Sequence, residues 1–319
     1  MRYHDVRDIP YIHKIMIGYL LHPRGYCFGV KRTVNMVEQV LKLYKSVYIV
    51  EDIVHSKLFM DNVLSKGVIK AHSIDDVPDG SAIMFSSRGI SPKILKKADE
   101  KQLTVIDATC PIVKELQDCI VAKAEEGYTI ILIGSRSHQQ IATLLGSVNN
   151  DDVYIVNNEM DVDLLPSLED KKVVYFTQTS LFPNNVKKIV DNLKIKIPEI
   201  AHGRNNSEYD ICQETLDRQN VIAKIAPKID LLIVLGSAYS ANAVSLVQCG
   251  NANNIKNVIR IDSVESIQKD LLNGVDSFAL VSSTSIDECI IKDIENSLQN
   301  LAGIEYIIYP QIEEQRVTA

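Results

Sequence analysis

Short apolar runs, each followed by small polar residues and then by an amphipathic segment, recur along this chain of 319 residues. The runs are rich in β-branched residues and apolar throughout, a pattern typical of strands that are covered on both faces, as in parallel sheets. We therefore predict strands at 14–20, 47–50, 82–85, 103–107, 129–134, 153–156, 172–176, 231–236, 258–261 and 277–281.

The segments between these runs have the spacing of helices. One helix is expected to start just after Cys27, because its apolar residues fall on a single face: Val30, Val34, Val37, Leu41 and Tyr44. A second helix begins with Pro111, a residue suited to the first helical position. Alternating strands and helices indicate an α/β fold with right-handed crossovers.

Three cysteines lie where a predicted strand gives way to a helix, in GYCFGV (Cys27), DATCPIV (Cys110) and YDICQET (Cys212). The intervals, 83 and 102 residues, each fit one small α/β lobe. We therefore expect three small parallel-sheet lobes in a pseudo-threefold trefoil, each lobe offering one thiol at a helix start, where thiolates are favoured. The expected divisions are an N-terminal extension (1–13), three lobes (14–110, 111–211, 212–308) and a C-terminal tail (309–319).

Composition narrows the classes of function. The chain has 46% hydrophobic residues and a net charge of -7, so neither nucleic acid nor an anionic membrane is an expected partner. No apolar run approaches the roughly 18 residues of a membrane span, and the polar start lacks a secretory pattern; we expect a cytoplasmic protein. Its six cysteines, without a C-x-x-C pair, then favour metal or redox roles over disulfides. Cys119, Cys249 and Cys289 lack polar neighbours and are assigned to packing.

Five predicted strands end in small polar groups: MFSSRG (84–89), LIGSRSH (132–138), YFTQTS (175–180), VLGSAYS (234–240) and LVSSTS (280–285). Any one of these segments is as readily a turn or a helix cap. Five together indicate an anion site, because ligands bind beyond the carboxyl ends of parallel strands and phosphates bind hydroxyls and helix N-termini. Arg88, His138 and His55 would add charge-assisted donors.

In HPRGYCFGV, IDATCPIV, GSRSHQQ, TQTS, DICQETLDRQ and GSAYSAN, from about residue 14 to about residue 308, the chain resembles the 4-hydroxy-3-methylbut-2-enyl diphosphate reductase family. The resemblance implies a central [4Fe–4S] cluster held by Cys27, Cys110 and Cys212, with the fourth iron open to substrate. It implies loss of the substrate's hydroxyl to give isopentenyl and dimethylallyl diphosphates, with electrons from ferredoxin or flavodoxin.

The resemblance also assigns the substrate-binding residues. Thr179 matches the threonine that binds the substrate hydroxyl, and Ser180 keeps the hydroxyl of the residue after it. The diphosphate contacts map onto His55, His138, Ser240, Asn242 and Ser285, and Arg88 stands where the family has a histidine. Arginine can still bind diphosphate, but it does not titrate near neutral pH. Ala241 replaces a serine, so one further hydroxyl is lost.

Gln140 is the most consequential departure, because the family has there a glutamate that delivers protons. A glutamine can hydrogen-bond but has no acidic proton. In one interpretation the chain catalyses the family reaction slowly, or with another proton source such as water reached through Thr179. In the alternative it is a divergent paralogue that keeps the cluster but acts on another substrate or serves as a non-catalytic cluster-binding protein.

Overall fold

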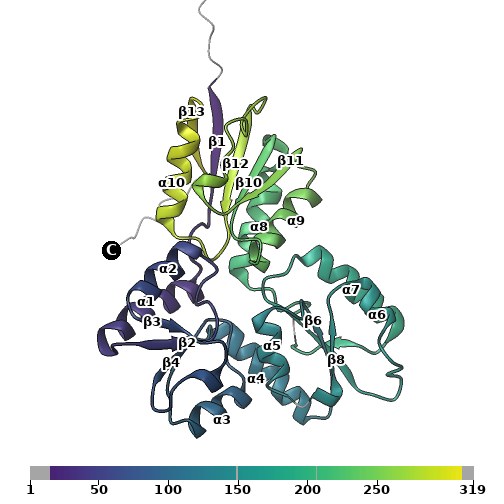
Figure 1. Cartoon of the computed structure of the whole chain (residues 1–319). Helices are drawn as coiled ribbons and strands as arrows, with labels where there is room; N and C mark the ends of the chain where they lie inside the picture. The colour runs from purple at the N-terminus through teal and green to yellow at the C-terminus, as the bar shows by residue number, and fades with distance from the viewer. Residues whose placement is uncertain (1–14, 149, 206, 311–319) are drawn as a thin grey trace, which may run out of the picture.

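The computed structural model describes residues 15–148, 150–205 and 207–310, so the expected extension 1–13 and most of the expected tail lie outside the described residues. Three α/β lobes meet at a common centre (Figure 1). Each lobe has its own sheet, and every strand pairing in the described ranges is parallel. The predicted architecture of three parallel-sheet lobes is confirmed.

Lobe B, at the lower left of Figure 1, is built on the sheet β3-β2-β4-β5. Helix α1 packs Val37 and Val40 onto Val47 and Ile49 of this sheet, as the periodicity after Cys27 predicted. The elements are α1 (Phe28–Leu43), β2 (Val47–Ile49), α2 (Lys57–Ser65), β3 (Val68–Lys70), a 3₁₀ turn (Ile74–Asp76), β4 (Ala82–Phe85), α3 (Pro92–Glu100) and β5 (Thr104–Asp107).

Lobe C, at the lower right, is built on the sheet β7-β6-β8-β9. Strands β6 and β8 are buried along their whole length, as expected for apolar runs covered on both faces. The elements are α4 (Pro111–Glu125), β6 (Thr129–Ile133), α5 (Gln139–Leu145), a 3₁₀ turn (Asn150–Asp152), β7 (Val153–Val156), α6 (Glu159–Asp163), β8 (Val173–Thr177), α7 (Pro183–Lys196) and β9 (Ala201–His202).

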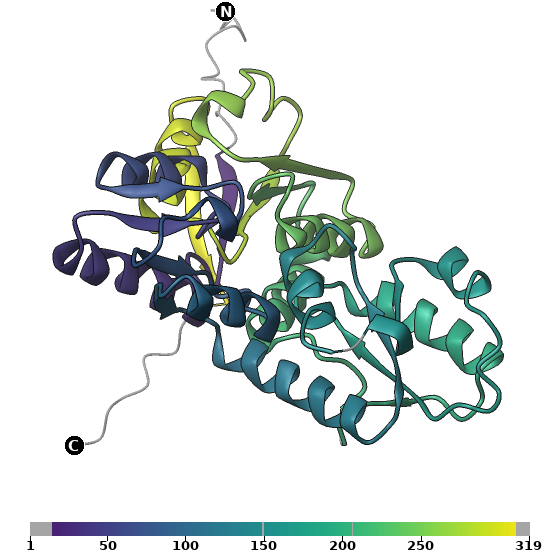
Figure 2. The same cartoon turned by 60° about the horizontal axis from the view of Figure 1, so that its bottom comes forward.

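Lobe A, at the top, has the five-stranded sheet β11-β10-β12-β1-β13. Its elements are β1 (Met16–Leu21), α8 (Gln213–Ile225), a 3₁₀ turn (Ala226–Lys228), β10 (Leu231–Leu235), α9 (Ala241–Ala252), β11 (Asn257–Ile261), a 3₁₀ turn (Val264–Ser266), β12 (Ser277–Ser282), α10 (Glu288–Gln299) and β13 (Ile304–Tyr309). In Figure 2, turned from the first view, lobe C lies to the right, while lobes A and B overlap on the left.

Strand β1 corrects one part of the expected division. The interval 14–110 grouped it with lobe B, but β1 lies hydrogen-bonded between β12 and β13 of lobe A. Apart from this inserted strand, the three sheets share one order, in which the four strands of each lobe lie as second, first, third and fourth along the chain. This repeated order is the pseudo-threefold relation that the cysteine spacing suggested.

The ten predicted strands are all present, whereas β3, β9 and β13 were not predicted. Each of these three lies at the edge of its sheet. None of the described helices is long and apolar enough to cross a membrane.

Candidate functional site

The three principal cysteines occupy equivalent places in the fold. Cys27, Cys110 and Cys212 are the N-cap residues of α1, α4 and α8, and none of their side chains makes a capping hydrogen bond. Each of these helices packs onto the next lobe's sheet, so each thiol lies at a lobe junction. The predicted position at helix starts is correct, but Cys212 follows a loop from β9 and does not directly end a strand.

A repeated backbone contact fixes the three cysteines. The N–H of Cys27 donates to the Thr284 carbonyl at 3.1 Å, that of Cys110 to Ser87 at 3.0 Å, and that of Cys212 to Thr179 at 3.0 Å. These acceptors stand two residues past the ends of β12, β4 and β8, the third strand of each lobe. The fold therefore holds each cysteine against the loop that follows the same strand of its lobe.

All three cysteines line one cavity of about 140 Å³. Cys110 lies tightly against α1: a side chain on Gly29 would place its Cβ 3.0 Å from Cys110 Sγ. Among the described residues, no three Cys, His, Asp or Glu side chains gather closely enough to bind one shared metal ion. A four-iron cluster has a wider spacing, since each thiolate binds a different iron.

The polar residues predicted from the strand ends gather on the wall of this same cavity. They are His55, Arg88, His138, Gln140, Thr179, Ser180, Ser240, Asn242 and Ser285. A larger cavity of about 830 Å³ shares His55, Arg88, His138 and Ala241 with it and extends between the lobes. The structure thus gathers every predicted site residue at the centre of the trefoil, while their individual roles stay predictions.

The two histidines are neutral hydrogen-bond donors at this wall. His138 caps α5, and its Nδ1 accepts the Gln140 backbone N–H at 3.2 Å, so the ring's proton must be on Nε2. Burial, and then the charge of Arg88, lower the pKa of His138 to about 4 and that of His55 to about 4. Both can donate to an anion without being charged beforehand.

Arg88 connects two lobes. Its Nε donates to Gln139 Oε1 of lobe C at 2.5 Å, and its Nη2 donates to the Asp52 carbonyl of lobe B. Burial lowers the pKa of Arg88, and the Glu51 carboxylate opposes that shift. Protein acceptors therefore take up most of the hydrogen bonds that the Arg88 guanidinium can donate. An anion in the cavity would be attracted mainly by its positive charge.

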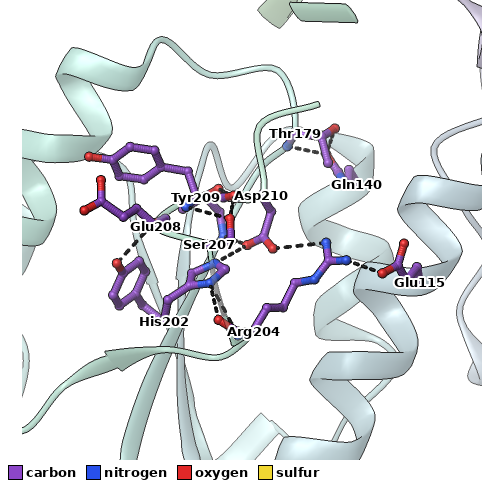
Figure 3. Close-up of polar contacts among 11 residues, drawn as sticks. Glu115, Gln140, Thr179, His202, Arg204, Ser207, Glu208, Tyr209 and Asp210 are labelled. Atoms are coloured by element: carbon purple, nitrogen blue, oxygen red, sulfur yellow. Dashed lines mark hydrogen bonds and ion pairs between the residues drawn. The ribbon is translucent and has the colours of Figure 1, made fainter. Parts of the chain in front are cut away.

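Gln140 has an orientation fixed by its neighbour Thr179 (Figure 3). The Thr179 backbone N–H and hydroxyl donate to Gln140 Oε1 at 3.2 and 3.1 Å. A backbone N–H can only donate, so the amide oxygen must face Thr179. The other end, Nε2, is buried without a partner, in a residue that is 2% exposed and lines the cavity.

Three further predicted residues already have protein partners. Asn242 donates through Nδ2 to Thr215 Oγ1 at 3.2 Å and accepts the Thr284 N–H at 3.0 Å. Ser240 caps α9 by accepting the Ala243 N–H, and Ser285 contacts the hydroxyl of Ser283. These bonds place the side chains and leave Asn242 one N–H and the serines their remaining hydrogen-bonding capacity for a ligand.

A buried network supports the segment that leads to Cys212 (Figure 3). The Asp210 carboxylate accepts the Thr177 N–H at 2.7 Å and contacts His202 Nε2 at 3.0 Å, while the Asp210 N–H donates to the Thr177 hydroxyl at 2.8 Å. Arg204 pairs with Asp210 at 3.6 Å and with Glu115 of α4. This network fixes the Cys212 segment against β8. Sequence reasoning did not identify it.

Sequence reasoning also assigned no role to Glu214, Thr215 and Arg218, although they lie in the motif DICQETLDRQ. Glu214 and Thr215 line the cavity beside Cys212. The signal for Thr215 and Arg218 was the helical spacing from Cys212, which places residues 212, 215 and 218–219 on one face of α8.

The model of the LytB protein family matches residues 19–299. A 4-hydroxy-3-methylbut-2-enyl diphosphate reductase of Buchnera aphidicola is 33% identical over 93% of both chains. The apicoplast enzyme of that name from Plasmodium falciparum is 38% identical over 89% of this chain, which spans about half (52%) of that relative's length.

Solved structures agree. The Plasmodium falciparum E-1-hydroxy-2-methyl-but-2-enyl-4-diphosphate reductase has a TM-score of 0.86 at 35% identity, covering 92% of each chain. A second reductase structure, described as the terminal enzyme of the non-mevalonate pathway, has a TM-score of 0.62 at 26% identity and covers 89% of this chain and 100% of its own. The chain belongs to the LytB family, the 4-hydroxy-3-methylbut-2-enyl diphosphate reductases.

Proposed function

We propose that the chain is a cytoplasmic iron–sulfur reductase that removes the hydroxyl of 4-hydroxy-3-methylbut-2-enyl diphosphate. Two electrons and two protons replace that hydroxyl by hydrogen and release water, giving isopentenyl and dimethylallyl diphosphates. The observation that carries the proposal is the single cavity that brings three N-cap cysteines together with the predicted anion donors. The relatives compared above all have names of this reductase, which gives the alternative of a different substrate no support.

The cavity fits a [4Fe–4S] cluster. Its cysteines are three soft sulfur donors from three helices, with side chains free of capping bonds, and thiolates are the usual ligands of such clusters. The missing side chain of Gly29 leaves room for Cys110 Sγ. Cys27, Cys110 and Cys212 would hold the cluster, which would pass electrons to the substrate and act as a Lewis acid toward its hydroxyl.

The protein's own residues would then bind and orient the substrate. Neutral His55 and His138 donate to the diphosphate, together with Ser240, Asn242 and Ser285, and the charge of Arg88 favours the anion. The Thr179 hydroxyl donates a hydrogen bond to Gln140 Oε1, so its oxygen can accept a hydrogen bond from the substrate's hydroxyl. Gln140 Nε2 supplies a further donor on the same wall.

Gln140 limits what this arrangement can do with protons. An amide N–H stabilises a ligand oxygen but does not transfer its proton at neutral pH. Losing a general acid typically costs about 10²–10⁴-fold in rate. We infer that the reaction is slow, or that protons arrive through water at the cavity.

Anaerobic reconstitution followed by turnover tests the proposal. The iron-loaded protein, given the substrate and a strong one-electron donor, should yield both isopentenyl and dimethylallyl diphosphates, slowly. Ferredoxin and flavodoxin should each be tried as the physiological donor. The proposed reaction would be ruled out if the protein bound no cluster. It would also be ruled out if neither the loaded wild type nor the loaded Gln140→Glu variant formed either product.

A further inference from the structure

Arg218 is a fully buried cation beside the cysteine cavity. It is 1% exposed and is the largest of the fully buried side chains in the described ranges. It lies on α8, the helix that Cys212 caps, and that helix contacts β1 and β12 of lobe A. Burying a charge is costly unless it is paired and hydrogen-bonded, so the partners of this guanidinium indicate its purpose.

The guanidinium connects the segments that carry two of the three cysteines. Its Nη2 donates to the Gly25 carbonyl at 2.9 Å, just before Cys27, and its Nε donates to the Ser282 carbonyl at 3.2 Å. The Ser282 hydroxyl accepts the Gly25 N–H at 2.8 Å, which closes the contact between these two segments. Arg218 therefore ties the approach to Cys27 to the helix of Cys212.

The remaining contacts of Arg218 are with Glu214, a residue of the cavity wall. Arg218 Nη1 donates to the Glu214 carbonyl at 2.9 Å and to Glu214 Oε2 at 2.8 Å. Glu214 lines the cavity, and its side chain is 37% exposed. The positive charge is thus fully enclosed, while its negative partner is partly in solvent, where its field is weakened. Because the charge of Glu214 is screened more than that of Arg218, the pair makes the electrostatic potential at the cavity more positive.

Thr215 provides a second, independent contact from the same helix face. Its Oγ1 accepts from Asn242 Nδ2 at 3.2 Å and lies 3.3 Å from Cys212 Sγ. Since Asn242 uses a lone pair of that oxygen, the hydroxyl proton is free to point at the sulfur. Hydrogen bonds to the ligating sulfurs and nearby charge are among the factors that set the reduction potential of an iron–sulfur cluster.

We propose that Arg218 is a positioning residue that holds Cys27 and Cys212 in register and whose buried charge raises the reduction potential of the cluster. The inference rests on the proposed function, because it presumes that these thiols bind a cluster. The reduced cluster carries one more negative charge than the oxidised one, so a nearby enclosed cation stabilises the reduced form more.

The test is a redox titration of the loaded protein, with two variants of opposite expected sign. In Arg218→Met, the ratio of reduced to oxidised cluster at a fixed solution potential should fall at least about tenfold, equivalent to about 59 mV for a one-electron couple. In Glu214→Gln, which removes the compensating carboxylate, the same ratio should rise. Arg218→Lys should keep most of the wild-type ratio but retain less iron, because it keeps the charge and loses the forked hydrogen bonds.

Arg260→Met is the matched control. Arg260 also donates to a backbone carbonyl of lobe A, that of Gly236 at 2.9 Å, but its partners Gly236 and Asp262 do not line the cysteine cavity, whereas Glu214, the partner of Arg218, does. The Arg260→Met variant should leave the ratio unchanged. Equal potentials in wild type, Arg218→Met and Glu214→Gln, with only iron lost, would show a purely structural role and overturn the inference. If Arg218→Met does not fold, an unchanged reduction potential in Glu214→Gln is sufficient to overturn the inference. A wild-type protein without a cluster would instead reject the proposed function.

Discussion

The hydroxyl and the backbone N–H of Thr179 both donate to the same atom, Oε1 of Gln140, at 3.1 and 3.2 Å. This pair of bonds leaves Gln140 Nε2 buried, without a partner, on the wall of the cysteine cavity. A glutamate in this position would put one oxygen toward Thr179 and the other where Nε2 now lies. Burial without a partner raises the pKa of a carboxyl, so that second oxygen would be protonated and would face the cavity as an acid.

We therefore predict that Gln140→Glu increases turnover of 4-hydroxy-3-methylbut-2-enyl diphosphate by at least about tenfold, within the range that general acid catalysis supplies. The measurement is product formation by the loaded variant under anaerobic conditions. Gln139→Glu is the matched control: it makes the same chemical change one residue earlier, where the side chain accepts from Arg88, and should give no increase. A wild-type rate already of order 1–10³ s⁻¹ would mean instead that protons reach the substrate without residue 140.

The three N-cap cysteines should be separable from Cys249 and Cys289 by iron binding. Cys27→Ser, Cys110→Ser and Cys212→Ser are each expected to lose most cluster iron, since a serine hydroxyl is a poor substitute for a thiolate. Cys249→Ser and Cys289→Ser, one buried in lobe A and one exposed, should keep it. Iron and sulfide content after anaerobic reconstitution give the comparison. Normal iron in any of the first three variants would remove that cysteine from the ligand set.

The features predicted from sequence are those with a local cause. Apolar runs such as 129–133 identify central strands because both faces are buried. The edge strands β3 and β9 are short and partly exposed, so their patterns resemble loops. Strand β13, IEYIIY, has the Ile and Tyr residues typical of strands, so its sequence could have predicted it. The position of β1 between β12 and β13 depends on pairings across more than 250 residues, which no local pattern encodes.

The candidate site shows the same division. Motifs identified the cavity wall from Cys27 to Ser285, because strand ends and helix starts carry recognisable residues. Arg218 was missed because arginine inside a helix ordinarily lies in solvent. The bond between Thr179 and Gln140 joins the loop after β8 to helix α5 of lobe C, and its direction became evident only when the donors were placed in space.

Gly29 should tolerate a methyl group poorly when the cluster is bound. An alanine Cβ would lie 3.0 Å from Cys110 Sγ and 3.2 Å from Cys110 Cβ. Helix propensity favours alanine over glycine by about 1 kcal/mol, whereas overpacking costs about 1–3 kcal/mol. We expect Gly29→Ala to change the stability of the cluster-free protein by no more than about 2 kcal/mol, but to lose iron faster under mild chelation. Equal rates of iron loss in variant and wild type would show that Cys110 can shift without harm.

The histidines of the cavity wall predict how stability depends on pH. Burial and Arg88 lower the pKa values of His55 and His138 to about 4, from an ordinary value of 6.5 in an unfolded chain. Above pH 6.5 both states are neutral and the histidines contribute nothing. Between pH 6.5 and about 4 the unfolded chain binds protons that the folded chain does not, so stability falls as the pH falls, by at most about 1.4 kcal/mol per pH unit for each histidine.

Replacing these two side chains should therefore flatten the acid side of the stability profile. Urea unfolding of the cluster-free protein, measured between pH 7.5 and 4, is expected to show a shallower loss of stability for His55→Gln and His138→Gln than for wild type, with the two effects partly additive because the histidines influence each other. His72→Gln, at an exposed position of lobe B, is the control and should follow wild type. Carboxylates contribute to acid unfolding in every variant, so the difference from wild type is the quantity that matters. If His55→Gln and His138→Gln lose stability as steeply as wild type over this range, the two rings do not resist protonation in the fold, and their role as neutral donors to the diphosphate would have to be abandoned.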